Sequence, residues 1–204
     1  MDKKLSYEEG IFCVKFARDN IIEYLNNRTT LLDKININTL SAVFKEYRGV
    51  FTTLNTYSPH NLRGCIGIPE PIMPLINALS QSSISAAVED PRFPPVSLNE
   101  INNIVVEVSI LTPPKQIIVN NPIEYLDNIV IGRDGLIIEY GLYRGLLLPQ
   151  VPKEYNWSVE EYLDQICLKA GLPPKTWLDE KVKLYSFEAQ IFKELTPNGK
   201  VVEE

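Results

Sequence analysis

Histidine and glycine-rich motifs are scarce in this chain of 204 residues, and each absence excludes a class of site. A single histidine cannot build a multi-histidine metal centre, and the chain contains neither H-E-x-x-H nor C-x-x-C. The patterns G-x-G-x-x-G, G-x-x-x-x-G-K-[ST] and G-x-S-x-G are also absent. We therefore predict no metal site, no phosphate-binding loop of those two kinds and no hydrolase nucleophile elbow.

Basic charge is scarce as well. The chain has 20 Lys and Arg against 26 Asp and Glu, a net charge of −6, and no basic run exceeds two residues. Nucleic-acid binding is disfavoured, because it requires many neutralised phosphates. The longest uncharged stretch, residues 71–88, carries six polar side chains, and the first residues lack an apolar signal core. We therefore expect neither a membrane span nor export.

Only three cysteines are present, and they lie far apart in the chain. This spacing is typical of reduced thiols, so we expect a cytoplasmic protein. Cys13 and Cys167 fall in predicted helices among apolar neighbours, where free cysteine is commonly a small buried hydrophobe. Cys65 falls in a predicted strand and is considered separately below.

The hydrophobic pattern predicts an α+β fold. Ser6 with Glu9 forms a capping box before the apolar run 11–25, and Ser158 with Glu161 forms a second one. Another helix is predicted to begin at Pro71 or Pro74. Strands are predicted at residues 50–55, 62–68, 104–111, 129–131, 136–140, 146–148 and 185–191. Few helices and many antiparallel-looking strands indicate mixed and antiparallel sheets with a few flanking helices.

The most unusual segment is the predicted strand 62–68. Arg63, Cys65 and Gly67 share one face of it, and about 6.5–7 Å separates Arg63 from Cys65 along the backbone. A guanidinium that reaches the sulfur would favour the thiolate, the reactive form of cysteine. Gly67 is expected to leave that face empty beside the sulfur, and Gly64 to let another backbone approach from behind. His60, in the preceding turn, is the only imidazole available as a base.

Each of these residues also has a structural interpretation that the sequence leaves open. Cys65 can be a small buried hydrophobe, and His60 can be a solvated turn residue. Arg63 can pair with a carboxylate, as a buried arginine often must. Gly64 and Gly67 can belong to a β-bulge.

Four further polar residues are candidate ligand-binding groups. Asp90 and Arg92 lie in an Asp-Pro-Arg segment at the end of a predicted helix, where they can project into a cleft. A helix end followed by a stiff loop explains the same segment. Arg144 and Gln150 bracket an apolar strand and can face either a pocket or solvent.

The hexapeptide Leu-Arg-Gly-Cys-Ile-Gly at 62–67 resembles the hallmark of the AMMECR domain family. Further blocks resemble the family at residues 49–54, 90–96, 106–114, 131–136, 144–151 and 167–173. The resemblance spans nearly the whole chain. It implies an α+β protein with a larger and a smaller sub-domain that share a groove, with the hexapeptide near that groove. We accordingly expect one domain over residues 5–197 and a C-terminal tail over 198–204.

The same resemblance implies an intracellular family whose prokaryotic members are associated with Memo-like and radical S-adenosylmethionine proteins. It suggests participation in a modification pathway and assigns neither a reaction nor a cofactor. His60 lies outside the hexapeptide, so the resemblance gives it no role.

Two functional hypotheses follow. In the first, the protein is an enzyme or enzyme subunit with Cys65 as nucleophile, Arg63 as anion-binding group and His60 as base, while Gly64 and Gly67 shape the pocket. In the second, it is a non-enzymatic module whose groove binds a small molecule, a peptide or a partner protein.

Overall fold

The computed structural model describes residues 4–204, which form two compact units. Unit 1 comprises residues 4–111 and 190–204, and unit 2 comprises Thr112–Ala189. Each unit combines one antiparallel sheet with α-helices, so the predicted α+β class is confirmed. No helix in this part of the chain has the length and hydrophobicity needed to cross a membrane.

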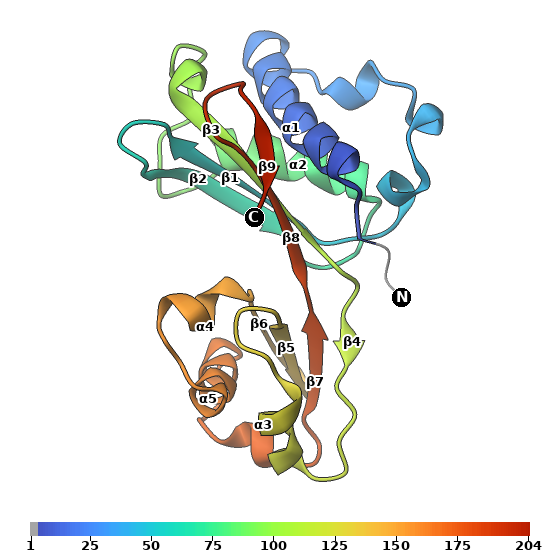
Figure 1. The fold of residues 1–204 in the computed structure, drawn as a ribbon, viewed down its shortest axis with the longest axis vertical. Helices are drawn as coiled ribbons and strands as arrows, with labels where there is room; N and C mark the ends of the chain where they lie inside the picture. The colour runs from blue at the N-terminus through green and yellow to red at the C-terminus, as the bar shows by residue number, and fades with distance from the viewer. Residues whose placement is uncertain (1–3) are drawn as a thin grey trace. The chain divides into compact units, whose positions relative to one another are not determined.

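Unit 1 is a five-stranded sheet with two helices on one of its faces (Figure 1). Its strands, in the spatial order β2-β1-β3-β8-β9, are β2 (Leu62–Ile68), β1 (Val50–Thr56), β3 (Ile104–Leu111), β8 (Ala189–Glu194) and β9 (Val201–Glu203). The helices are α1 (Tyr7–Asn27) and α2 (Leu75–Val88), with short 3-10 turns at Leu31–Asp33, Ile37–Thr39, Ala42–Lys45 and Glu100–Asn103. The other face of the sheet carries the alternate side chains of each strand.

Local sequence explains where the helices of unit 1 begin and how closely they pack. Both hydrogen bonds of the predicted Ser6–Glu9 capping box are present at the start of α1. Helix α2 begins directly after Pro74, and its buried serines pack against both neighbours: Ser80 and Ser83 accept from Asn20 of α1, and Ser82 lies against β1. The Ser82 hydroxyl lies 2.8 Å from that of Thr52, so small polar side chains satisfy each other where the helix meets β1.

The core of unit 1 includes an ion pair between Arg18 of α1 and Glu194 of β8, both almost fully buried. The Arg18 guanidinium also donates to the carbonyls of Ile101 and Ile104, and Glu194 accepts the Val106 amide at 2.9 Å. These added hydrogen bonds satisfy both charges, which would otherwise be costly to bury.

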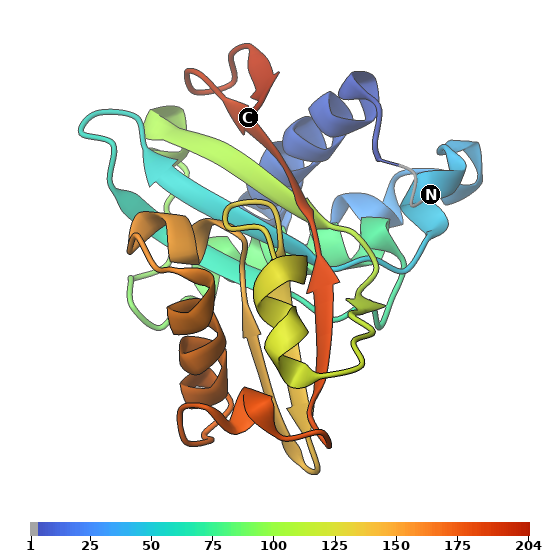
Figure 2. The same ribbon diagram turned by 60° about the horizontal axis from the view of Figure 1, so that its bottom comes forward.

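Unit 2 is a four-stranded sheet in the order β4-β7-β5-β6, and Figure 2 shows its helices beside these strands. The strands are β4 (Lys115–Gln116), β7 (Lys183–Phe187), β5 (Gly135–Tyr140) and β6 (Tyr143–Leu147). The helices are α3 (Tyr125–Asn128), α4 (Gln150–Glu154) and α5 (Val159–Lys169), with 3-10 turns at Pro122–Glu124 and Thr176–Leu178. The predicted Ser158–Glu161 capping box is confirmed, and Tyr162 and Trp177 are buried in the core.

Three predicted elements differ from the structure. Residues 129–131 are not a strand, because the Asp134 carboxylate accepts the Val130 amide at 2.8 Å and closes a turn instead. The predicted strand 185–191 is two strands, β7 and β8, which belong to different sheets. The predicted tail 198–204 contains β9, whose Val201 is buried and accepts a hydrogen bond from the Tyr7 hydroxyl.

Candidate functional site

Cys65 lies in β2, at the edge of the unit 1 sheet, on the face opposite α1 and α2. It is partly exposed, whereas Cys13 and Cys167 are buried as predicted. Cys65 is paired with Thr53 of β1, and the Thr53 hydroxyl donates a hydrogen bond to its sulfur at 3.3 Å. Cys65 is therefore the thiol that solvent molecules can reach.

Asp90 and Arg92 hold the backbone of Cys65 at the free edge of the sheet. The Cys65 amide donates to the Asp90 carboxylate at 2.8 Å, and the Arg92 guanidinium donates to the Cys65 carbonyl at 3.2 Å. The two side chains thus supply the acceptor and the donor that a neighbouring strand would supply. This arrangement closes the edge at Cys65 and fixes the position of the thiol.

Asp90 is buried and stays ionised in this arrangement. Hydrogen bonds from the Arg92 guanidinium, at 2.9 and 2.7 Å, are the main reason that its pKa is lowered well below the usual range. The Cys65 and Arg92 amides lower it further, and burial acts in the opposite direction. Because the Asp90 carboxylate accepts hydrogen bonds from both Arg92 and the Cys65 amide, it holds the backbone of Cys65 in place; its role in ligand binding stays a prediction.

Arg92 is the cation that contacts Cys65, through a hydrogen bond to its backbone carbonyl. Its side chain is 54% exposed, so it is open to solvent while it contacts the edge of the sheet. Its pKa is raised first by the hydrogen bonds to Asp90, then by the Asp90 charge, with smaller contributions from the charge and hydrogen bonding of Cys65.

Arg63 has a different partner from the one that the strand spacing suggests. Its guanidinium donates to Glu100 at 3.0 and 3.4 Å, and its side chain is only 11% exposed. It also lies 5.9 Å from the centre of the Phe93 ring, and Arg92 lies 5.6 Å from the same ring. The structure therefore favours the carboxylate-pairing alternative for Arg63, and Arg92 is the arginine that hydrogen-bonds to Cys65, at its backbone carbonyl.

The two glycines of the hexapeptide have separate roles. A Cβ at Gly64 would lie 2.1 Å from the carbonyl oxygen of Ala86, so Gly64 allows the predicted close approach of another backbone, that of α2. A Cβ at Gly67 would lie 2.2 Å from the ring of Phe51, its partner in β1. The prediction of an empty space beside the sulfur is therefore wrong, because the Phe51 ring covers Gly67.

His60 is exposed in the turn between β1 and β2, which contains the cis peptide Ser58–Pro59. Among the described residues, no hydrogen bond joins His60 to Cys65. Glu107 of β3, which no sequence motif indicated, is a titratable residue with a shifted pKa on the same face of the sheet as Cys65. Burial is the main cause of the raised pKa of Glu107. The available signal was the one charged residue in the middle of a largely apolar strand.

Arg144 and Gln150 belong to unit 2, whereas Cys65, Asp90 and Arg92 belong to unit 1. Arg144 is exposed on β6 and lies 3.5 Å from the carboxylate of Glu139. Gln150 is the first residue of α4, and its side-chain oxygen is buried with no hydrogen-bond partner within residues 4–204. The groove that the family resemblance implies stays a prediction.

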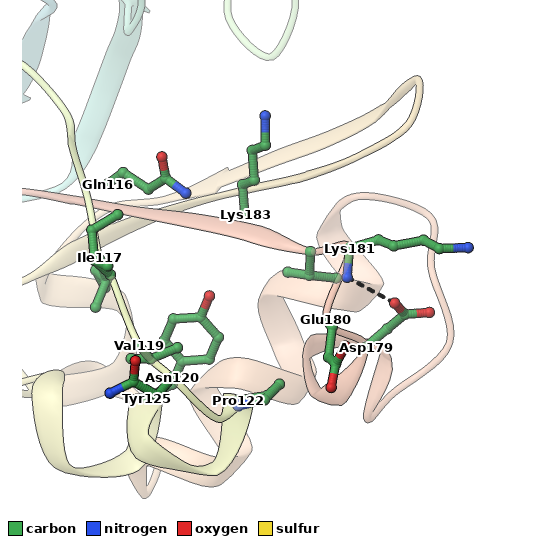
Figure 3. A pocket seen from close by; sticks show the side chains of 12 residues that line it. Gln116, Ile117, Val119, Asn120, Pro122, Tyr125, Asp179, Glu180, Lys181 and Lys183 are labelled. Carbon is green, nitrogen blue, oxygen red and sulfur yellow. Dashed lines mark hydrogen bonds between the residues drawn. The ribbon is translucent and has the colours of Figure 1, made fainter.

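Each unit also contains a pocket that Cys65 does not line. The pocket of unit 2, about 430 Å³, lies between the chain after β4 and the start of β7, and Tyr125, Lys181 and Lys183 are among its lining residues (Figure 3). The pocket of unit 1, about 420 Å³, is lined by Tyr24 and by residues of α2 such as Gln81. Residues 4–204 contain no group of three or more His, Cys, Asp or Glu side chains placed to hold a metal ion.

Comparison with known proteins identifies the class to which this fold and this Cys65 segment belong. The AMMECR1 family matches residues 14–192, and the chain belongs to that family. The protein MJ0810 of Methanocaldococcus jannaschii is 64% identical over 200 residues, covering 98% of this chain and 97% of that protein. A protein of Methanococcus aeolicus is 63% identical over 202 residues, covering 99% of each chain.

A solved structure shares the fold. The crystal structure of the uncharacterized protein PH0010 from Pyrococcus horikoshii matches with a TM-score of 0.84 and 48% identity, covering 99% of both chains. Family membership and fold are thus established together, and the chemistry has to be argued from the site.

Proposed function

We propose that the protein uses Cys65 as a nucleophile toward an anionic, carbonyl-bearing substrate, with Arg92 as the anion-binding group. The association of prokaryotic family members with Memo-like and radical S-adenosylmethionine proteins supports a modification pathway as the setting. A cytoplasmic location is part of this proposal.

The observation that carries the proposal is the arrangement around Cys65. Cys65 is partly exposed, its sulfur accepts a hydrogen bond from Thr53, and its backbone carbonyl accepts one from a guanidinium that is open to solvent. Its backbone is held on both sides by Asp90 and Arg92. A cysteine that served only to fill a core would need none of these polar contacts.

The step that this geometry supports is acyl transfer to sulfur. The Cys65 sulfur attacks the carbonyl carbon, a sulfur–carbon bond forms, and the bond to the leaving group breaks with its electron pair on the leaving group. The thiol proton leaves the sulfur and finally reaches the leaving group or solvent. Arg92 binds an anionic part of the substrate through its exposed guanidinium.

Alkylation kinetics test the proposal directly. Native protein is treated with neutral iodoacetamide or anionic iodoacetate, and the modified cysteine is located by peptide mass spectrometry. We expect Cys65 to react at pH 7 at least about tenfold faster than a small reference thiol, because Thr53 donates a hydrogen bond to its sulfur and Asp90 and Arg92 fix its backbone beside an exposed cation. Cys13 and Cys167 serve as internal controls, since both are buried.

The role of Arg92 has a matched control in unit 2. Arg133 is 53% exposed and pairs with the buried Asp134 at 2.7 Å, much as Arg92 pairs with Asp90. We expect Arg92→Gln to reduce the rate with iodoacetate more than the rate with iodoacetamide, and Arg133→Gln to change neither. A Cys65 that reacts no faster than the reference thiol below pH 8 would contradict the nucleophile role.

A binding module is the second candidate, and the Phe93 ring is the observation that favours it. Two guanidinium groups, those of Arg63 and Arg92, lie within 6 Å of this one ring, and Arg92 is open to solvent. Such a surface suits a ligand with a carboxylate. A Cys65→Ala protein that keeps every binding partner and every cellular phenotype would favour this candidate over the nucleophile.

A further inference from the structure

Glu107 lies in line with Cys65 on the face of the unit 1 sheet opposite α1 and α2. Thr53 of β1 pairs with Cys65 of β2 on one side and with Glu107 of β3 on the other. Residues that oppose each other on antiparallel strands have Cβ atoms about 4.5–5.5 Å apart. Cys65, Thr53 and Glu107 therefore form a row across three adjacent strands, which Figure 1 shows side by side.

We propose that Glu107 accepts the proton of the Cys65 thiol through the hydroxyl of Thr53 when Cys65 reacts. This inference rests on the proposed role of Cys65 as a nucleophile and adds the group that removes its proton. The hydroxyl of Thr53 already contacts the sulfur, and Glu107 is the residue that pairs with Thr53 on its other side.

Each proton that moves along this path has a donor and an acceptor. The Cys65 sulfur gives its proton to the Thr53 oxygen, and the Thr53 hydroxyl gives its own proton to a carboxylate oxygen of Glu107, directly or through one water. The sulfur keeps its electron pair and uses it for the bond to the substrate carbon. After the transfer the Thr53 hydroxyl donates to the thiolate, which is the direction of the hydrogen bond in the structure.

The surroundings of Glu107 suit a proton acceptor. The chain around it removes water, which raises its pKa, and the charge of Glu204 raises it further. Lys193 of β8 and His60 of the β1–β2 turn act in the opposite direction. A carboxylate with a raised pKa is a stronger base than a solvated one. Thr53 separates it from the sulfur, so its charge is not placed directly against the thiolate.

Glu107 also explains why His60 need not act as the base. His60 is exposed and has no hydrogen bond to Cys65 among the described residues, whereas Thr53 connects the sulfur to the strand that carries Glu107. In this arrangement Lys193 supplies a positive charge that acts against the raised pKa of Glu107.

Iodoacetamide alkylation of Cys65 between pH 5 and 9 separates a proton acceptor from a mere neighbouring charge. A carboxylate that acts only by its charge opposes the thiolate, so Glu107→Gln would then react faster than the wild type. A carboxylate that accepts the proton makes Glu107→Gln slower, by about tenfold or more at pH 7. We also expect the wild-type rate to fall in D2O and this effect to vanish in Glu107→Gln.

Variants of Thr53 and a distant glutamate complete the test. Thr53→Val, which removes only the hydroxyl, is expected to match the slow Glu107→Gln rate, and Thr53→Ser to restore the wild-type rate. Glu154→Gln, an exposed residue of unit 2, is the matched control and should change nothing. Thermal unfolding of each variant establishes that it is folded.

The outcomes separate this inference from the proposed function. A fast wild-type Cys65 whose rate is unchanged or increased in Glu107→Gln overturns the proton path and leaves the nucleophile intact. A wild-type Cys65 no faster than a reference thiol overturns the nucleophile itself. A slow Glu107→Gln together with a wild-type-like Thr53→Val overturns the part assigned to Thr53.

Discussion

Each unit contains a buried aspartate that pairs with a half-exposed arginine close by in the sequence. The two aspartates differ in which backbone amide they accept a hydrogen bond from. In unit 2, Asp134 accepts the amide of Val130, four residues earlier, and closes a local turn. In unit 1, Asp90 accepts the amide of Cys65, 25 residues earlier, and closes the edge of a sheet. The chemistry of the pair is the same, and the backbone that it holds determines its role.

The comparison shows why Asp90 and Arg92 matter for the candidate site although neither is the reacting group. A turn closed by Asp134 would affect only its own loop if it opened. The contact between Asp90 and β2 sets the position of the Cys65 thiol, because it is the hydrogen-bond partner on the open side of that strand. Positioning of this kind is what a reactive side chain requires from its supporting residues.

Removing the two aspartates is expected to give the largest effects. Asp90→Ala and Asp134→Ala each leave a backbone amide and a guanidinium without their acceptor, and we expect each to lower the free energy of unfolding by about 2–3 kcal/mol. Only Asp90→Ala should also change the alkylation rate of Cys65. Urea unfolding and iodoacetamide kinetics on both variants measure the two effects, and equal changes in Cys65 reactivity would remove the distinction between the pairs.

The two edge strands also differ in how closely a helix approaches them. A Cβ at Gly64 of β2 would lie 2.1 Å from the Ala86 carbonyl oxygen, and one at Gly145 of β6 would lie 2.8 Å from the Ala170 amide nitrogen. Gly64→Ala should therefore destabilise by about 2 kcal/mol and Gly145→Ala by about 1 kcal/mol. Urea midpoints compare them, and a larger loss for Gly145→Ala would contradict the contact geometry.

Acid should weaken unit 1 through Asp90, and this is the smallest of the three effects. The pKa of Asp90 is lowered in the folded state, so its contribution to stability is present above the unfolded-state pKa of about 3.9 and is lost as the pH falls below that value. The stability difference between wild type and Asp90→Asn should therefore shrink below about pH 3.9. Unfolding curves from pH 7 to 3 measure it, and a difference independent of pH would show that the Asp90 charge has no part in it.

Much of the fold followed from short-range patterns. Both capping boxes and strand 62–68 could be predicted because helix caps and strand alternation depend on residues at most a few positions apart. Residues 129–131 were mispredicted because Asp134 offers the Val130 amide a closer partner than a sheet does. The break between β7 and β8 could not be predicted, because apolar and polar residues alternate in the sequence without interruption from residue 185 to residue 191.

The sequence by itself determined that Cys65 shares a strand face with Arg63 and Gly67 and that the other two cysteines are buried. Only the tertiary structure decided that Arg63 pairs with Glu100, that Phe51 covers Gly67 and that Asp90 and Arg92 hold Cys65. The physical reason is that the face of a strand depends on the geometry of adjacent peptide units. The partner of a charge depends instead on which distant segment the folded chain brings within about 3 Å of it, a distance that only the assembled chain defines.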